Sequence, residues 1–195
     1  SPPFSKKRWL DNNAHLLTSN YLIRSKKDLD LKVNLSYTND LQQQNGNTQT
    51  KFFTSTDNIN IIENTNNRLF FNSLKSKFIL TKNTNKNYFK NSFEINNYWD
   101  SQNGKIVLND ESINQKTEIP FTSFTNKLKI IKPFGEKLFT IKSVLSYSKS
   151  PQNLIVTPSQ FEDLLNNSNT FEKLNQKIEH SNFYANNSFS FTKKN

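Results

Sequence analysis

The sequence predicts an all-β fold, an antiparallel up-and-down meander of about seven or eight strands. Three observations lead to this prediction. Apolar and polar residues alternate over several segments, short polar turns join these segments into hairpins, and the composition is polar yet rich in aromatic residues. Only 33% of the 195 residues are hydrophobic and 32 are Asn, which leaves little material for a packed interior, while 13% aromatic residues argue against disorder.

The clearest strand is the segment 29–38, in which every second residue is apolar. The apolar positions are Leu29, Leu31, Val33, Leu35 and Tyr37. This period of two predicts a strand with one apolar and one polar face. The turn 25–28 joins it to a weaker alternation over 14–24, so we expect a first hairpin over 14–38.

The same unit recurs along the chain. Hairpins are expected over 69–99, around the polar turn 83–87, and over 121–148, around the turn 133–136. A final alternating segment predicts a last strand over about 181–193. All these units belong to a single segment that covers residues 1–195.

Three long polar stretches lie between the hairpins, over 40–66, 101–120 and 149–178, and we expect them to be loops, within which Asn58 to Ile62 and Lys105 to Leu108 are candidates to extend strands. The last stretch includes a predicted short helix that begins at Thr157, with Pro158 as its first helical residue. Loops of this length are uncommon in compact soluble domains, where the median connection is about 4 to 6 residues. Short turns on one side and long loops on the other are typical of transmembrane β-barrels. The sequence therefore predicts part of the wall of such a barrel.

Strand alternation assigns the side chains of this wall to two faces. The residues expected to face lipid are Leu31, Val33, Leu35, Phe70, Leu74, Phe78, Phe93, Ile95, Ile141 and Leu145. The aromatic girdle at the membrane interface is expected to contain Tyr37, Tyr88, Trp99 and Tyr147. The basic residues expected to face the lumen are Lys32, Lys75, Lys77, Lys90, Lys129 and Lys142.

The composition argues against several other classes of protein. The chain has no Cys, 2 His and 3 Gly, so we expect no metal site, no cofactor, no catalytic residue and no enzymatic activity. No apolar run reaches the roughly 18 residues that a transmembrane helix needs. The net charge of +10 raises the possibility of nucleic-acid binding, but Phe and Lys alternate onto opposite faces, so no nucleic-acid partner is expected.

Four stretches carry a resemblance to a known family. They are residues 63–74, 88–104, 108–111 and 158–164. They resemble the barrel region of TonB-dependent receptor-like outer-membrane proteins of the Bacteroidota type, which are often described as containing a carboxypeptidase-like regulatory domain. The resemblance covers most of the chain from about Trp9 onward, and it lies in strand and loop texture rather than in a catalytic signature.

The resemblance implies a role in ligand or nutrient uptake at the bacterial outer membrane. Its implied partners are outer-membrane lipid, the remainder of the barrel with its plug domain, TonB and a surface lipoprotein. Barrels of this family have about 22 strands, so the chain is expected to be a fragment, although a complete small barrel of eight strands is the alternative. The alternative of another class is a secreted or surface-located soluble all-β adhesin or carbohydrate-binding module.

Overall fold

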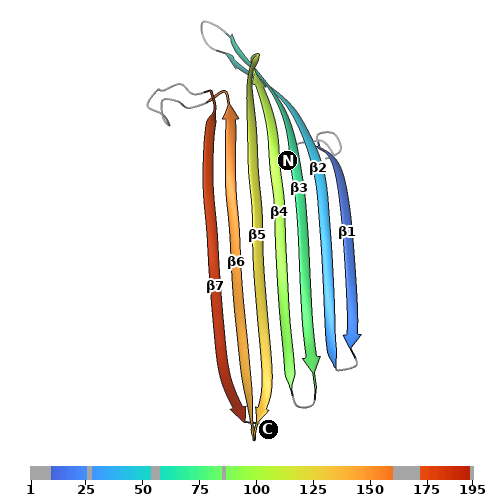
Figure 1. Ribbon diagram of the computed structural model, residues 1–195. Helices are drawn as coiled ribbons and strands as arrows, with labels where there is room; N and C mark the ends of the chain where they lie inside the picture. Colours follow the sequence, from blue (N-terminus) through green and yellow to red (C-terminus); the bar gives the residue numbers. More distant parts are fainter. Residues whose placement is uncertain (1–9, 26–27, 54–57, 85–86, 160–171, 194–195) are drawn as a thin grey trace.

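The computed structural model describes residues 10–25, 28–53, 58–84, 87–159 and 172–193. They form seven strands in one antiparallel sheet, in which each strand pairs with the next along the chain (Figure 1). The strands are β1 (Leu10–Ser25), β2 (Leu29–Phe53), β3 (Asn58–Asn83), β4 (Tyr88–Leu108), β5 (Glu111–Phe134), β6 (Lys137–Thr157) and β7 (Leu174–Lys193). The predicted all-β meander is confirmed.

The three predicted hairpins lie within the pairs β1–β2, β3–β4 and β5–β6, but the strands are much longer than expected. The predicted loops over 40–66 and 101–120 are wrong, because both stretches are almost entirely strand. The stretch 149–178 begins and ends as strand; the helix expected from Thr157 falls mostly on residues 160–165, outside the described residues. These strands resemble loops in sequence because they are rich in Asn, which is normally depleted in sheets.

Asn side chains stabilise the long upper ends of the strands by pairing with one another. The end of the sheet that carries the β1–β2, β3–β4 and β5–β6 turns is the lower end in Figure 1. Towards the upper end, Asn66 donates to Asn45 at 2.7 Å, and Asn47 donates to Asn64 at 2.5 Å. Both bonds join directly opposed residues of β2 and β3. Each therefore adds a cross-strand bond to the backbone ladder.

Tight turns close two of the hairpins. At the lower end Gly135, with φ of 61°, occupies the left-handed region between β5 and β6. At the upper end Asn109 and Asp110 both have positive φ and join β4 to β5. The amide N–H of Asn109 donates to the carbonyl of Ile62 at 3.1 Å, and the N–H of Ile62 donates to Asn109 Oδ1 at 2.9 Å. This turn is thereby fixed against β3.

Two backbone ladders are interrupted near the middle of the sheet. No pairing joins residues 71–72 of β3 to residues 99–100 of β4. The β5–β6 ladder has a similar gap, which contains Pro120 and Pro151. Proline has no N–H to donate and is normally confined to edges and irregular sites, so these prolines lie where the ladder bond is already missing.

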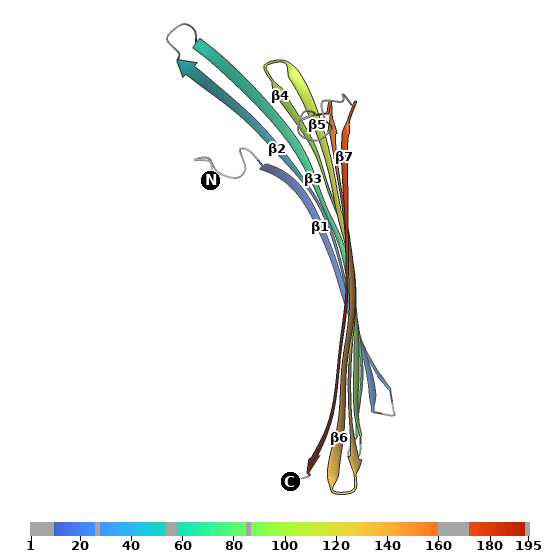
Figure 2. The same ribbon diagram turned by 90° about the vertical axis from the view of Figure 1, so that its left-hand side faces the viewer.

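The sheet has no hydrophobic core. It is a single layer whose upper part, most clearly in β2 and β3, curves away from the lower half (Figure 2). Among the described residues no hydrophobic side chain is buried, and the accessible surface is 14765 Å². A compact protein of 22.8 kDa would expose about 9,600 Å². Both faces of the sheet are therefore open.

Both edges of the sheet are open as well. β1 pairs only with β2, β7 pairs only with β6, and no contact joins β1 to β7. The described strands therefore form an open sheet rather than a closed barrel.

Candidate functional site

One face of the sheet carries a broad apolar belt. We define face A as the face that bears Phe78 and Phe93, which are directly paired, and face B as the opposite face. Cross-strand pairing places all ten predicted lipid-facing residues on face A. They remain accessible; Phe78 is 36% exposed and Leu145 is 42% exposed. Leu31, Phe78 and Leu145 thus do not meet in a sealed interior.

The belt has the same height on the two central strands. On β3 it extends from Phe70 to Leu80, and on β4 from Phe89 to Trp99, which is eleven residues in each case. Ten steps along a strand rise about 33 Å. At a tilt of about 40° this rise projects to about 25 Å, the height of the apolar band on membrane barrels.

The belt also crosses the sheet obliquely. One row of paired residues runs from Leu41 and Phe70, the upper limit of the belt on β2 and β3, to Asn153 on β6. On β6 the belt ends at Tyr147, six residues or about 20 Å below Asn153. The upper edge of the belt therefore falls by about 20 Å between β2 and β6, which are about 19 Å apart. The upper edge is thus inclined by roughly 45° to the perpendicular of the strands.

The lower edge of the belt is inclined in the same sense. Leu29 on β2 lies in one row with Ile141 on β6, and on β6 the belt continues two residues further down, to Phe139. This step is about 7 Å over the same width, an inclination of roughly 20°. Strands of membrane barrels tilt by about 35–45°, which lies between the inclinations of the two edges.

Three of the four predicted girdle residues lie at the upper edge of the belt. Tyr37, Trp99 and Tyr147 are on face A, where they are 41%, 49% and 40% exposed. The fourth, Tyr88, lies on the opposite face from the other three. Tyr88 is the first residue of β4 and points to face B, beneath Lys129 Nζ at 5.5 Å from the ring centroid, and its neighbour Phe89 takes the belt position.

Polar side chains within the belt satisfy one another. Asn126 donates to Asn91 Oδ1 at 2.8 Å across β4 and β5. Both residues belong to face A and are partly buried. An amide that faces an apolar surrounding without a partner is costly, so this bond lowers the cost of placing two Asn residues in the belt.

Face B carries the six predicted basic residues. Lys32, Lys75, Lys77, Lys90, Lys129 and Lys142 all point to it, and Lys127 joins them from β5. Lys77 Nζ lies 3.2 Å from Glu94 Oε2, and Lys75 Nζ lies 5.5 Å from the centroid of the Tyr98 ring. The lower half of face B is therefore a hydrophilic, predominantly cationic surface.

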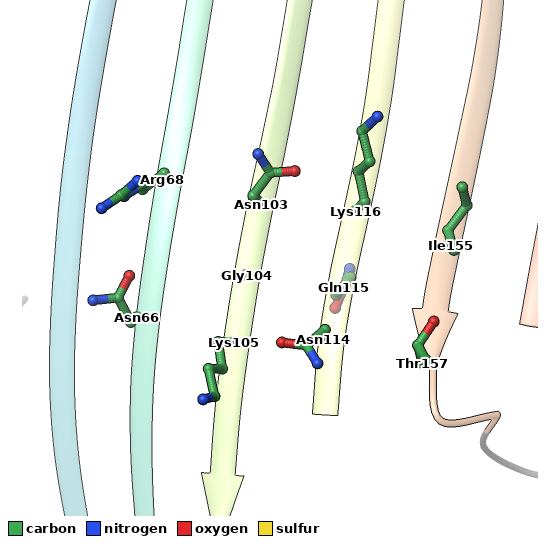
Figure 3. A pocket seen from close by; sticks show the side chains of 10 residues that line it. All are labelled: Asn66, Arg68, Asn103, Gly104, Lys105, Asn114, Gln115, Lys116, Ile155 and Thr157. Atoms are coloured by element: carbon green, nitrogen blue, oxygen red, sulfur yellow. The ribbon is translucent and has the colours of Figure 1, made fainter. Parts of the chain in front are cut away.

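Above the belt face A becomes polar and forms a shallow groove of about 280 Å³ (Figure 3, in which the upper ends of the strands point downwards). Arg68, Lys105 and Lys116 line it, together with Asn66, Asn103 and Asn114. Lys116 Nζ lies 2.7 Å from Glu118 Oε1. The hydrogen bond that Lys116 donates holds the pKa of the Glu118 carboxyl below its usual range. This groove was not predicted, because all of these residues except Arg68 fall within the stretches expected to be loops.

At the upper edge of the belt and above it, face B carries aromatic and aliphatic side chains among polar ones. Tyr98 and Phe121 pack with ring centroids 5.7 Å apart, and Ile106 pairs with Ile113 closer to the upper end. The apolar parity of β3 changes at Phe70 and Phe71, which lie on opposite faces. That change of parity is the signal from which the sequence could have revealed where the belt ends on β3.

The described residues offer no grouping suited to catalysis by a metal. No three His, Cys, Asp or Glu side chains gather within the described ranges. Within the same part of the chain, no helix is long and apolar enough to cross a membrane.

Comparisons with known proteins leave the family open. No protein-family model matches the chain, and no curated protein matches it.

Proposed function

We propose that the chain is part of the wall of a bacterial outer-membrane β-barrel of the TonB-dependent receptor-like class. Face A lies against lipid and face B lies towards the lumen. The observation that carries this proposal is the oblique apolar belt, whose height and inclination suit tilted strands crossing a bilayer. A belt about 33 Å long in the strand direction that extends over about 29 Å of sheet is larger than the apolar patch of about 300–600 Å² that soluble monomers expose.

The open edges support a larger assembly. β1 and β7 each present a row of unpaired backbone groups, which in a bilayer must find partners because lipid offers none. In this proposal the remainder of the barrel supplies strands that pair with both edges. A wall also explains the missing core, because its apolar side chains contact lipid instead of one another.

The role that fits such a wall is uptake of a ligand or nutrient, without an enzymatic step. The cationic lower half of face B and the aromatic cluster around Tyr98 and Phe121 then line the passage and contact a plug domain or the ligand. TonB and a surface lipoprotein are the further partners, and only the resemblance in sequence supports them.

Single spin labels test the orientation directly, because the chain has no Cys of its own. Leu35→Cys, Phe78→Cys and Leu145→Cys place a label on the belt. Ser36→Cys, Lys77→Cys and Ser146→Cys place it on the neighbouring residue of face B. In lipid vesicles we expect belt labels to be accessible to oxygen and shielded from a water-soluble nickel complex, with the reverse pattern on face B.

Asn66→Cys is the matched control, because it lies on face A above the belt and is expected to contact water. The membrane proposal fails if the chain stays monodisperse without detergent and the belt labels are shielded from both reagents. That result would mean a protein partner covers face A, as expected for the soluble adhesin or carbohydrate-binding module.

A further inference from the structure

Three lysines on face B lie side by side across three strands. Lys90 of β4 is the direct partner of Lys129 of β5, which is the direct partner of Lys142 of β6. Neighbouring strands are about 4.8 Å apart, and like charges directly opposite one another destabilise a sheet. Lys127, two residues from Lys129 on the same face, adds a fourth cation. We call these four residues the lysine row.

The lysine row carries more positive charge than its acidic neighbours balance. None of its four members forms an ion pair within the described part of the chain. Two carboxylates share its face: Glu94, which is bonded to Lys77 and also attracts Lys127, and Asp30, which lies two strands away from Lys90 in the same row of paired residues. Lys129 instead lies over the ring of Tyr88. In the free protein the repulsion among the four ammonium groups is therefore only partly offset.

The lysine row surrounds a hollow. Its volume is about 380 Å³, and all four lysines, Lys77 and Ser92 contribute to its lining. Each ammonium group offers three donors on a flexible stem, a form that suits the oxygens of a compact anion. Ile79 and Val144 complete the face-B lining of the hollow. The donors and the excess of positive charge favour a ligand with several negative charges.

We propose that the lysine row is a binding site for a multivalent phosphate-bearing anion. Such a ligand contacts three or four cations at once and removes their mutual repulsion, so binding and stabilisation of the sheet are coupled. A single-stranded nucleic acid fits less well, because the Phe side chains of the belt lie on the opposite face and cannot stack with bases bound to the lysines. The site depends only on face B and does not require that face A contacts lipid.

Calorimetric titration with tripolyphosphate at low ionic strength tests the proposal on the full chain, in whichever medium keeps it dispersed. Lys129→Gln removes the central cation and reduces repulsion, so this variant is expected to fold. We expect it to weaken tripolyphosphate binding at least tenfold. Lys32→Gln is the matched control, since Lys32 lies on face B outside the hollow, and we expect less than a twofold change.

Thermal unfolding supplies a second measurement. Tripolyphosphate should raise the unfolding temperature of the unmodified chain and raise that of Lys129→Gln much less. The proposal is overturned if both variants bind equally, if inorganic phosphate binds as tightly as tripolyphosphate, or if polyglutamate alone binds in a Lys129-dependent way. The spin-label accessibilities of face A do not enter these measurements, so this inference and the membrane proposal can fail separately.

Discussion

Asp100 accepts a hydrogen bond from the backbone N–H of Asn72, with 3.1 Å between N and Oδ1, where the β3–β4 ladder is interrupted. A side chain thus replaces a strand as the acceptor for a partly buried amide. The interruption lies at the upper edge of the belt, beside Trp99.

Replacing Asp100 tests how much this contact stabilises the sheet. Asp100→Ala leaves the Asn72 N–H without its acceptor, and we expect a loss of about 1–3 kcal/mol in the free energy of unfolding. Asp100→Asn keeps a carbonyl oxygen and should lose less than half as much. Urea unfolding monitored by circular dichroism measures both. Equal losses for the two variants would show that the hydrogen bond is not the cause.

Trp99 reports on the surroundings of the belt. In a Trp9→Phe background it is the single Trp, and we expect brominated acyl chains to quench its fluorescence strongly in vesicles. The matched variant carries Trp9→Phe, Trp99→Phe and Phe121→Trp, which moves the indole to face B at nearly the same level. Its quenching should be several-fold weaker. Equal quenching at both positions would contradict the assignment of the faces.

A charge in the belt should be far more costly than a charge above it. We expect Leu74→Lys to lower the free energy of unfolding in lipid vesicles by about 2–4 kcal/mol, because Leu74 lies one residue from the middle of the belt on β3 and the ammonium group is placed near the bilayer midplane. Asn66→Lys, on the same face of the same strand but beside Arg68 in the polar groove, should change it by less than about 1 kcal/mol. Denaturant titration in vesicles compares the two variants.

The amide pair in the belt should show strong coupling. Asn91→Ala leaves the Asn126 amide without its acceptor and is expected to cost about 1–3 kcal/mol. Replacing both residues by Leu removes the need for a bond, and we expect little loss or a gain in stability. A double-mutant cycle in denaturant measures the coupling. Additive losses would indicate that water, rather than the partner amide, satisfies these groups.

The Lys116–Glu118 pair predicts a small dependence of stability on pH. The hydrogen bond from Lys116 lowers the pKa of Glu118 below its ordinary value of 4.5, so the carboxylate stabilises the fold above that value. The contribution disappears as the pH falls through the lowered pKa. Above the ordinary pKa, the free energies of unfolding of the unmodified chain and of Glu118→Gln should differ by less than about 1 kcal/mol, because the ion pair is exposed. This difference should shrink as the solution is acidified.

Alternation alone was sufficient to predict the strands and faces of the lower half. Every second residue from Leu29 to Tyr37 shares face A, as expected, and all six predicted basic residues share face B. The upper half could not be predicted in this way. There the alternating residues are Asn, Thr and Gln, whose contribution comes from cross-strand hydrogen bonds such as Asn45–Asn66 rather than from an apolar stripe.

The position of Tyr88 illustrates a second limit. Proximity to a predicted strand end placed it in the girdle, but only the register shows that its ring lies beneath Lys129 on the other face. The lysine row and the polar groove depend in the same way on pairings between separate strands, which one sequence does not disclose.

The change of face A from apolar to polar halfway along the strands protects the alignment of neighbours in a way that alternation cannot. A slip by one residue is penalised in any two-faced sheet because it reverses every side chain. A slip by two residues restores the faces and would normally be tolerated. Here it also shifts one strand's apolar limit by about 7 Å relative to its neighbours, so that Phe70 would lie beside Asn39 rather than Leu41. Even-numbered misalignments therefore carry a cost of their own.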